Sequence, residues 1–277
     1  MKMNKISILG CGWLGFPLAK KLIAEGFQVK GSVTTRSKLK TLSAAGIEPY
    51  SLVLDEEKVQ LKDPRFFDTD LVIVAIPPRR VDFIETIFPA QIKQLVHLLE
   101  EHRVPRVLFI SSTSVYNELG GKATEEDVLL PEKPSGKALV MAELLLSENR
   151  NFKTTVIRFG GLIGADRNPA RFLKRKVDPV SGLKPVNLIH QDDCIGIILK
   201  IIDQEAWGET FNACCPVHPT RQNFYERASE VSGIAAPEFN HEQVPFKLVD
   251  SSKLIHQLNY EFKYPSPLDY LNVVHIG

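Results

Sequence analysis

The stretch KISILGCGWLGFPLAKKLIAEGFQVKGSVTTR, residues 5–36, decides the fold of this 277-residue chain. Its first apolar residues, Ile6–Leu9, have the pattern of a buried strand, and residues 13–25 have the spacing of a helix that ends at Gly26. Between them, residues 10–15 match the pattern G-x-G-x-x-G. Because this pattern follows a strand and opens a helix, it predicts a turn whose backbone N–H groups bind a diphosphate at the start of that helix.

A secretory signal is the alternative interpretation of the same residues. Lys2 and Lys5 precede the apolar run, and Ile8–Cys11 is similar to a loose lipoprotein cleavage site. A signal peptide does not need glycines at this spacing, nor an amphipathic helix after them. Cleavage after Gly10 would also remove the first strand of the expected sheet. We therefore expect these residues to stay in the protein and to form a binding site.

The composition is that of an ordinary globular protein, with 44% hydrophobic and 24% charged residues. The formal net charge of +1 gives no global field that would recruit nucleic acid or an anionic membrane. No apolar run reaches the roughly 18 residues that a membrane span needs. We therefore expect a small-molecule substrate as the partner, and neither nucleic acid nor membrane.

The four cysteines, at positions 11, 194, 214 and 215, are too few and too irregular for a disulfide framework or a paired metal site. This usage predicts a cytoplasmic protein without a metal. The adjacent Cys214 and Cys215 leave a redox pair open, although two buried thiols at the end of a strand are the simpler interpretation.

Strands and helices alternate along the first two-thirds of the chain. The apolar pattern predicts further strands at 29–33, 50–54, 71–76, 107–110, 155–158 and 210–213. Helices are expected at 37–45, 85–103, 134–148, 192–202 and 220–232. This alternation predicts an α/β fold, a Rossmann-type doubly wound parallel sheet with a small C-terminal lobe. We assign dinucleotide binding to residues 1–164 plus about 187–213, and substrate binding to about 165–186 plus 214–277.

The end of the second strand indicates which dinucleotide binds. Proteins of this fold that prefer NAD carry a carboxylate there, which accepts hydrogen bonds from the adenosine ribose. Residues 32–38, SVTTRSK, contain no carboxylate, and their hydroxyls and guanidinium suit a 2′-phosphate. We therefore predict NADP(H) in preference to NAD(H), held by Thr34, Thr35 and Arg36. In the alternative interpretation, Thr35 and Ser37 only cap the next helix and Arg36 is solvated.

Three later segments follow in a characteristic order: FISSTSVY at 109–116, RFGGLIG at 158–164 and NLIHQDD at 187–193. Together with the glycine loop, they resemble the extended short-chain dehydrogenases/reductases of the NAD(P)-dependent epimerase/dehydratase family. The resemblance covers roughly residues 5–213. Leu9 stands where extended members usually have their first glycine. The chain is therefore more similar to the atypical members.

In that family, a hydroxyl four residues before the tyrosine of the V-Y pair holds the reacting oxygen of the substrate. The matching residues here are Ser112 and Tyr116. The resemblance therefore places Ser112 in the wall of an active site. In the alternative interpretation, hydroxyls at the end of a strand only satisfy loose backbone groups.

The usual proton-transfer pair of the family is missing. The family uses a Tyr with a Lys four residues later, ahead of a helix glutamate that corresponds to Glu143. Counting back places Ser135 and Leu139 in these two positions, and neither can replace an acid or a base. Ser135 is instead expected to be a helix N-cap. A displaced lysine, Lys137, is an alternative that we disfavour.

Tyr116, His190 and Asp193 are the candidate replacements for this pair. A histidine can act as an acid near neutral pH. A structural role is the alternative for both later residues, with His190 hydrogen-bonded between a strand and a helix and Asp193 as a helix cap.

Carried over residue by residue, the resemblance implies catalytic roles for Ser112, Tyr116 and His190. The expected cofactor site consists of Gly10, Cys11, Gly12, Trp13, Leu14, Gly15, Thr34, Thr35, Arg36, Ala75, Pro77, Ser111, Arg158 and Gly160. The expected substrate contacts are Ser112, Thr113, Arg79 and Arg171. Arg79 follows the fourth strand, at the edge where ligands meet such sheets. Arg171 belongs to a basic cluster after Gly164, for which a solvated face is the alternative.

These features predict an NADP(H)-binding, atypical epimerase/dehydratase-like oxidoreductase that acts on a small, sugar-like or anionic metabolite. A non-catalytic NAD(P)-binding or redox-sensing protein is the alternative, because the Tyr/Lys pair is absent. The glycine loop also resembles the start of two-domain hydroxyacid dehydrogenases, but the expected strands at 154–158 and 210–213 argue against them. The resemblance also allows a homodimer that pairs through residues 85–103 and 135–149.

Overall fold

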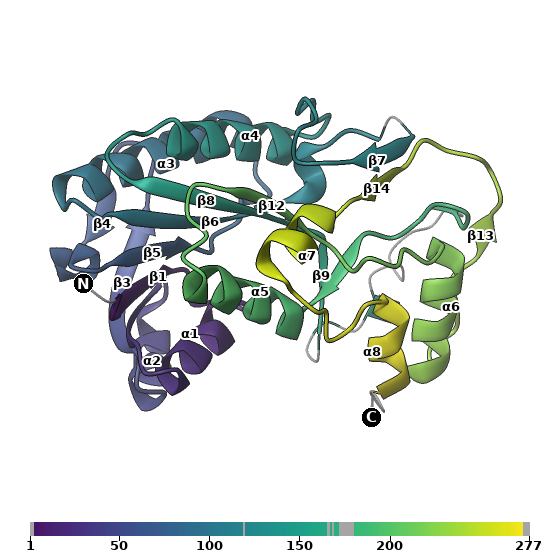
Figure 1. The fold of residues 1–277 in the computed structure, drawn as a ribbon, viewed down its shortest axis with the longest axis horizontal. Helices are drawn as coiled ribbons and strands as arrows, with labels where there is room; N and C mark the ends of the chain where they lie inside the picture. The colour runs from purple at the N-terminus through teal and green to yellow at the C-terminus, as the bar shows by residue number, and fades with distance from the viewer. Residues whose placement is uncertain (1–2, 119, 165–166, 168, 172–179, 274–277) are drawn as a thin grey trace. The chain divides into compact units, whose positions relative to one another are not determined.

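The computed structural model describes residues 3–118, 120–164, 167, 169–171 and 180–273 (Figure 1). Its largest sheet has eight strands in the order β12-β8-β6-β5-β1-β2-β3-β4. Their bounds are β1 Lys5–Leu9, β2 Gln28–Val33, β3 Glu48–Leu54, β4 Val59–Leu61, β5 Leu71–Val74, β6 Arg106–Ser112, β8 Lys153–Phe159 and β12 Thr210–Ala213.

The strand order reverses at β1, which pairs in parallel with β2 on one side and with β5 on the other. Ile6 is opposite Val29 in β2 and opposite Leu71 in β5. β2–β3 and β5–β6 are also parallel, whereas β3–β4 is antiparallel. In open sheets of this kind, ligands bind at the carboxyl ends of the strands where the order reverses. The predicted Rossmann-type sheet is confirmed, and its switch point lies at the glycine loop.

Helices cover both faces of the sheet. Figure 1 shows α3 (Ile84–Glu101) and α4 (Pro134–Ser147) on one face, and α1 (Gly15–Ala24) and α2 (Leu39–Ala44) on the other. The remaining helices are α5 Gln191–Asp203, α6 Arg221–Val231, α7 Ser252–Leu258 and α8 Pro267–Val273. β5 is buried along its whole length, as its continuous apolar run predicts for a strand covered on both faces.

The chain divides into two compact units. The first consists of Met1–Val115, Leu129–Arg158 and Ile201–Thr210, and the second of Tyr116–Val128, Phe159–Lys200 and Phe211–Gly277. The second unit contains three parallel strand pairs, which the sequence did not predict. They are β7 (Gly121–Ala123) with β14 (Lys247–Val249), β9 (Gly161–Ile163) with β11 (Leu188–His190), and β10 (Val180–Ser181) with β13 (Phe239–Asn240).

The caps predicted for α4 and α5 are wrong. Asp193 lies inside the first turn of α5, and its carboxylate accepts hydrogen bonds from the Tyr260 hydroxyl at 3.0 Å and the Lys263 N–H at 2.7 Å. It therefore anchors a distant segment of the second unit. At α4, Lys133 takes the N-cap position and no side chain caps the helix, so Ser135 is an ordinary first-turn residue.

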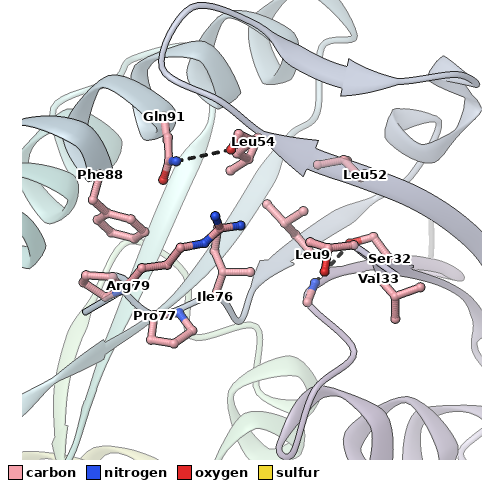
Figure 2. Close-up of a pocket in the computed structure, with 13 residues that line it drawn as sticks. Leu9, Ser32, Val33, Leu52, Leu54, Ile76, Pro77, Arg79, Phe88 and Gln91 are labelled. Carbon is pink, nitrogen blue, oxygen red and sulfur yellow. Dashed lines mark hydrogen bonds between the residues drawn. The ribbon is translucent and has the colours of Figure 1, made fainter. Parts of the chain in front are cut away.

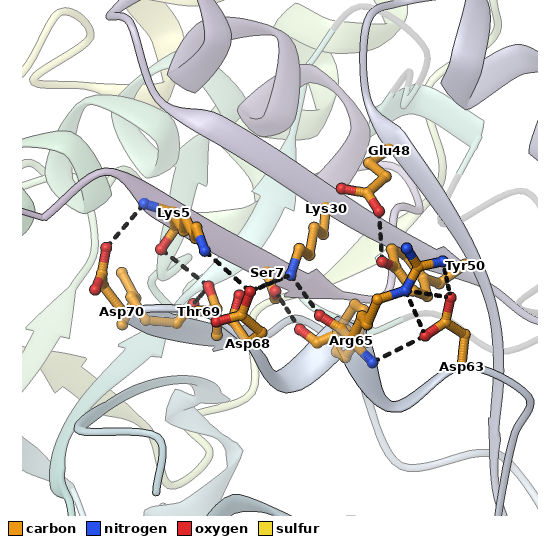
Figure 3. A network of polar contacts seen from close by, with 12 residues as sticks. Lys5, Ser7, Lys30, Glu48, Tyr50, Asp63, Arg65, Asp68, Thr69 and Asp70 are labelled. Atoms are coloured by element: carbon orange, nitrogen blue, oxygen red, sulfur yellow. Dashed lines mark hydrogen bonds and ion pairs between the residues drawn. The ribbon is translucent and has the colours of Figure 1, made fainter. Parts of the chain in front are cut away.

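A polar network fastens η2, the 3₁₀ turn Pro64–Phe67, to β1 and β2 (Figure 3). Ser7 of β1 donates to the Phe66 carbonyl at 2.6 Å. The buried Lys30 of β2 donates to the carbonyls of Arg65 and Asp68. Burial lowers the pKa of Lys30, whereas the nearby Asp68 carboxylate opposes that shift. The Lys30 ammonium thus binds carbonyls at the end of η2, the position at which a short helix leaves carbonyls without a helical partner.

Two glycines of the loop are required by geometry. Gly10 has φ of +103°, a left-handed conformation that side chains other than hydrogen disfavour. A Cβ on Gly15 would overlap the carbonyl oxygen of Gly10. The absence of a side chain at Gly15 therefore lets α1 start directly against the end of β1.

Replacing Gly15 should destabilise this junction. In Gly15→Ala, the added methyl group has to push α1 away from the backbone of Gly10, and we expect a loss of about 1–3 kcal/mol in the free energy of unfolding. Urea denaturation would measure it. Gly12→Ala is the matched control, because a Cβ there meets no atom within 4 Å and should leave stability unchanged. An unchanged urea midpoint in Gly15→Ala would contradict the close approach.

Candidate functional site

The glycine loop is held against the end of β2 by Ser32. The Gly10 N–H donates to the Ser32 hydroxyl oxygen at 3.1 Å, and the Cys11 N–H donates to the Ser32 carbonyl at 2.8 Å. Within the loop, the Gly12 N–H donates to the Gly10 carbonyl at 2.8 Å. These bonds fix the loop before any ligand binds.

The start of α1 suits an anion. The helix has Leu14 at its N-cap position, with no capping side chain and no acidic residue in its first turn. The first N–H groups of a helix have no intrahelical acceptor, and the helix dipole adds positive potential there. Beside them, the space that a Cβ on Gly12 would fill contains no protein atom. The loop from Gly10 to Gly15, which includes Trp13 and Leu14, could therefore hold a diphosphate, and the predicted contacts of these residues with it stay predictions.

Cys11 takes part in the glycine loop through its backbone N–H, and its thiol is unreactive. Its side chain is buried, and burial raises the pKa of the thiol to about 12, so it stays protonated at neutral pH. Burial also raises the pKa of Cys194, Cys214 and Cys215. All four cysteines are free. Thiols of this kind are poor nucleophiles, which agrees with the structural interpretation of the Cys214–Cys215 pair.

A cavity of about 290 Å³ lies beside the loop, within the first unit (Figure 2). Its walls come from the carboxyl ends of β1, β2 and β3, from the segment after β5 and from α3. The lining residues are Leu9, Gly10, Ser32, Val33, Thr34, Leu52, Leu54, Ile76, Pro77, Pro78, Arg79, Phe88 and Gln91. The cavity therefore brings together Gly10, Thr34 and Pro77, which were predicted to bind the cofactor, and Arg79, which was predicted to bind the substrate.

Three further residues that were predicted to bind the cofactor, Ala75, Thr35 and Arg36, are not among the lining residues of this cavity. Ala75 is half-buried, and its N–H donates to the Leu9 carbonyl at 2.8 Å. Thr35 and Arg36 are exposed at the start of η1, the 3₁₀ turn Arg36–Lys38. Thr35 is the N-cap residue of this turn but makes no side-chain capping bond, and Ser37 lies inside it. The capping interpretation of these hydroxyls is therefore wrong.

Ser111 and Arg158 form a buried polar cluster with Glu143. The Ser111 hydroxyl donates to Glu143 Oε1 at 2.5 Å, and Arg158 Nη2 donates to Glu143 Oε2 at 2.7 Å. The cluster links β6, α4 and β8. Gly160, in the second unit, donates its N–H to the Ala213 carbonyl at 3.0 Å. The cofactor contacts predicted for Ser111, Arg158 and Gly160 stay predictions.

Ser112 ends β6 and is half-buried, and its Oγ accepts the Ser114 N–H at 3.2 Å. Thr113 follows it, buried in η3, the 3₁₀ turn Thr113–Val115. Tyr116 belongs to the second unit, where its buried hydroxyl donates to Asn212 Oδ1 at 2.8 Å. Proton transfer by Tyr116 would therefore have to break a buried hydrogen bond.

The positions of the missing Tyr/Lys pair carry no acid or base. Leu139 is 4% exposed and belongs to the core, and Ser135 lies in the first turn of α4. Lys137 is exposed on the same helix. Counting back from Glu143 already gave a serine and a leucine in place of the Tyr/Lys pair. The buried surroundings of Leu139 agree with that assignment.

His190 is a buried histidine of the second unit, 6% exposed, and its ring centroid lies 4.4 Å from those of Tyr264 and Tyr270. Its Nδ1 accepts the Asp192 N–H at 3.1 Å, joining β11 to the start of α5 as the structural interpretation expects. Burial lowers the pKa of the imidazole, although Asp192 opposes the shift. His190 is therefore neutral at physiological pH.

The basic cluster after Gly164 is described only in part. Arg167 is half-buried, and burial lowers its pKa. Arg171 ends η4, the 3₁₀ turn Pro169–Arg171, but its side chain lies outside the described residues. Lys174, Arg175 and Lys176 also lie outside them. In the described part of the chain, no group of three or more His, Cys, Asp or Glu side chains could hold a metal, and no helix is long and apolar enough to cross a membrane.

The buried histidines predict how stability depends on pH. Burial lowers the pKa of both His190 and His218 below 6.5. Below about pH 6.5 the unfolded chain therefore binds protons that the folded chain does not. The free energy of unfolding consequently decreases as the pH is lowered. Urea denaturation between pH 7.5 and 5 would measure this slope.

We expect a shallower slope in His190→Gln, and a wild-type slope in His256→Gln, which replaces an exposed histidine. Equal slopes in wild type and His190→Gln would show that His190 is not held neutral.

Comparison with known proteins gives the family. The chain matches the family model described as NAD(P)H-binding over residues 10–203. It is 34% identical to Protein YeeZ of Escherichia coli K12 over 270 residues, which cover 96% of this chain and 98% of that protein. The glycine loop and all cavity residues except Leu9 fall within residues 10–203.

Two solved structures share the fold. A functionally unknown conserved protein from Silicibacter pomeroyi has a TM-score of 0.78 at 19% identity, with 97% of both chains covered. The UDP-glucuronic acid 4-epimerase of Bacillus cereus, in complex with UDP-glucuronic acid and NAD, has a TM-score of 0.76 at 20% identity, with 98% of both chains covered. The chain therefore belongs to the NAD(P)H-binding family, and it shares its fold with the NAD-dependent epimerases that its sequence resembles.

Proposed function

We propose that the protein is an NADP(H)-dependent, atypical epimerase/dehydratase-like oxidoreductase. The observation that carries this proposal is the juxtaposition of an uncapped helix start, Gly12 with open space beside it, and a cavity at the switch point of the sheet. A dinucleotide needs these parts together: N–H groups for its diphosphate and an apolar slot for its adenosine.

The preference for the phosphorylated dinucleotide rests on the end of β2. Thr34 lines the cavity, Arg36 follows it on η1, and no lining residue is a carboxylate. A carboxylate here would repel a 2′-phosphate, whereas a hydroxyl and a guanidinium bind one.

A bound nicotinamide would supply hydride transfer. The role that we assign to this chain is to hold the substrate oxygen with Ser112, at the carboxyl end of β6. Tyr116 and His190 are the candidates for proton transfer. The substrate that we propose is a small, sugar-like or anionic metabolite, because epimerases of this fold have been solved with UDP-sugars and because arginines follow β5 and Gly164. We assign binding of the substrate to the smaller lobe, residues 165–186 and 214–277. We also propose that the protein is located in the cytoplasm.

We also propose a homodimer that pairs through α3 and α4. α4 exposes two large apolar side chains, Met141 at 43% and Leu144 at 45%. Apolar side chains on one helix that face water are an expected feature of a surface that a partner covers.

A non-catalytic NAD(P)-binding or redox-sensing protein is the second candidate. The observation that favours it is Leu139, a core residue at the position of the catalytic lysine. Binding of the dinucleotide is common to both candidates, and turnover separates them.

The binding step is tested by titrating purified protein with NADPH and NADH. We expect NADPH to bind more tightly in the wild type, and Gly12→Ala to lose affinity for both because its methyl group occupies the space beside the diphosphate. A wild-type urea midpoint in the variant would show that the loss is local. Failure of the wild type to bind either dinucleotide would overturn the proposal.

Turnover is tested by following NADPH absorbance across a panel of sugar, nucleotide-sugar and oxo-acid substrates. If the protein is an enzyme, Ser112→Ala should lower kcat about 10²–10³-fold, the range for loss of one hydrogen bond that stabilises a transition state, with NADPH affinity kept. Tight binding without any oxidation across the panel would favour the non-catalytic candidate.

A further inference from the structure

Arg79 is the only charged residue among those that line the cavity beside the glycine loop. The other polar lining side chains are Ser32, Thr34 and Gln91. Two of these side chains already form hydrogen bonds within the protein. The Ser32 hydroxyl oxygen accepts the Gly10 N–H, and Gln91 Nε2 donates to the Leu54 carbonyl at 3.2 Å. The cavity thus combines apolar walls with one positive charge.

Within the described residues, Arg79 forms neither a hydrogen bond nor an ion pair with another side chain, and no carboxylate lines the cavity. Figure 2 shows its side chain extending between Phe88 and Ile76. A guanidinium has five N–H donors in a planar fork that matches a phosphate. The geometry therefore leaves this fork available to an anion.

The backbone before Arg79 keeps it in place. The residue follows β5 after two consecutive prolines, Pro77 and Pro78, which both line the cavity. Proline fixes φ, so the backbone that leads to Arg79 has little freedom to lose when a ligand binds. Arg79 and Arg36 are both exposed, but Arg36 lies on η1 and does not line the cavity.

The ligand chemistry follows from the neighbours. Leu52 and Leu54 on one side and Ile76 and Phe88 on another form walls suited to a flat ring (Figure 2). Thr34 stands at the end of β2, where the adenosine ribose lies in this fold. Because Thr34 and Arg79 line the same cavity, an anion on that ribose would share it with a hydroxyl and a guanidinium.

We propose that Arg79 is the principal ligand of the 2′-phosphate of NADP(H), and thus the residue that determines specificity for it. This inference rests on the proposed function, because it requires a dinucleotide in the cavity. It reassigns Arg79 from the substrate to the cofactor, and it makes Arg36 a secondary contact.

The test compares three variants, Arg79→Gln, Arg80→Gln and Arg36→Gln, by isothermal titration with NADPH and with NADH. We expect Arg79→Gln to weaken NADPH binding about 10- to 100-fold, the range for loss of a charged hydrogen bond, with NADH affinity changed less than about twofold. Arg80 is the matched control, an exposed neighbour outside the cavity lining, and its variant should bind both dinucleotides as the wild type does. Adenosine 2′-monophosphate should compete with NADPH in the wild type and lose this ability in Arg79→Gln.

Several results would overturn the inference. Equal loss of NADPH and NADH affinity would assign Arg79 to the shared diphosphate or ring, and no loss would assign it to the substrate or to solvent. A larger loss of NADPH affinity in Arg36→Gln would give the specificity to η1. Each of these leaves dinucleotide binding intact, whereas a wild type that binds neither dinucleotide would remove the proposed function itself. Far-UV circular dichroism and thermal melting would confirm that each variant is folded.

Discussion

The site depends on Ser32, which holds the glycine loop through both its side chain and its carbonyl. These two bonds fasten the N–H groups of Gly10 and Cys11 to β2, so the loop cannot swing away from the sheet edge. The turn then leads into α1 with its first N–H groups pointing out of the loop. The same β2 residue also lines the cavity, so one side chain both holds the glycine loop and forms part of the cavity wall.

The arrangement around Ser32 explains why so little of the site consists of charged side chains. The glycine loop offers backbone amides and a helix dipole, and the cavity walls are mostly apolar. Within such surroundings no carboxylate neutralises the guanidinium of Arg79. If Arg79 has the role that we propose for it, specificity for one dinucleotide over the other can change through one residue without any change in the fold.

The sheet was predictable because its pattern is local. Continuous apolar runs such as β5, and helical spacing such as that of α3, are each contained in fewer than 20 residues, and both were located within a few residues of their bounds. The short pairs of the second unit were not predicted. β7 and β14 have three residues each and lie more than 100 residues apart, so neither carries a period of its own.

The candidate site was predicted to the same extent and for the same reason. The glycine loop was found from the spacing of its glycines, and the structure shows that Gly10 and Gly15 are required for the turn and for the close approach of α1. The role of Asp193 depends on Tyr260 and Lys263, about 70 residues away, and the prediction of a cap was therefore wrong. The placement of Arg79 beside Thr34 required knowing that β5 and β2 flank β1, which no local pattern contains.

Leu139 limits which residues position 139 can accept. Since its side chain is packed in the core, a lysine at this position would bury an ammonium ion without a partner, at a cost of several kcal/mol. Introducing the Tyr/Lys pair of the extended short-chain dehydrogenases/reductases would therefore take more than an exchange of two residues, because the residues around α4 would have to be repacked to admit the lysine.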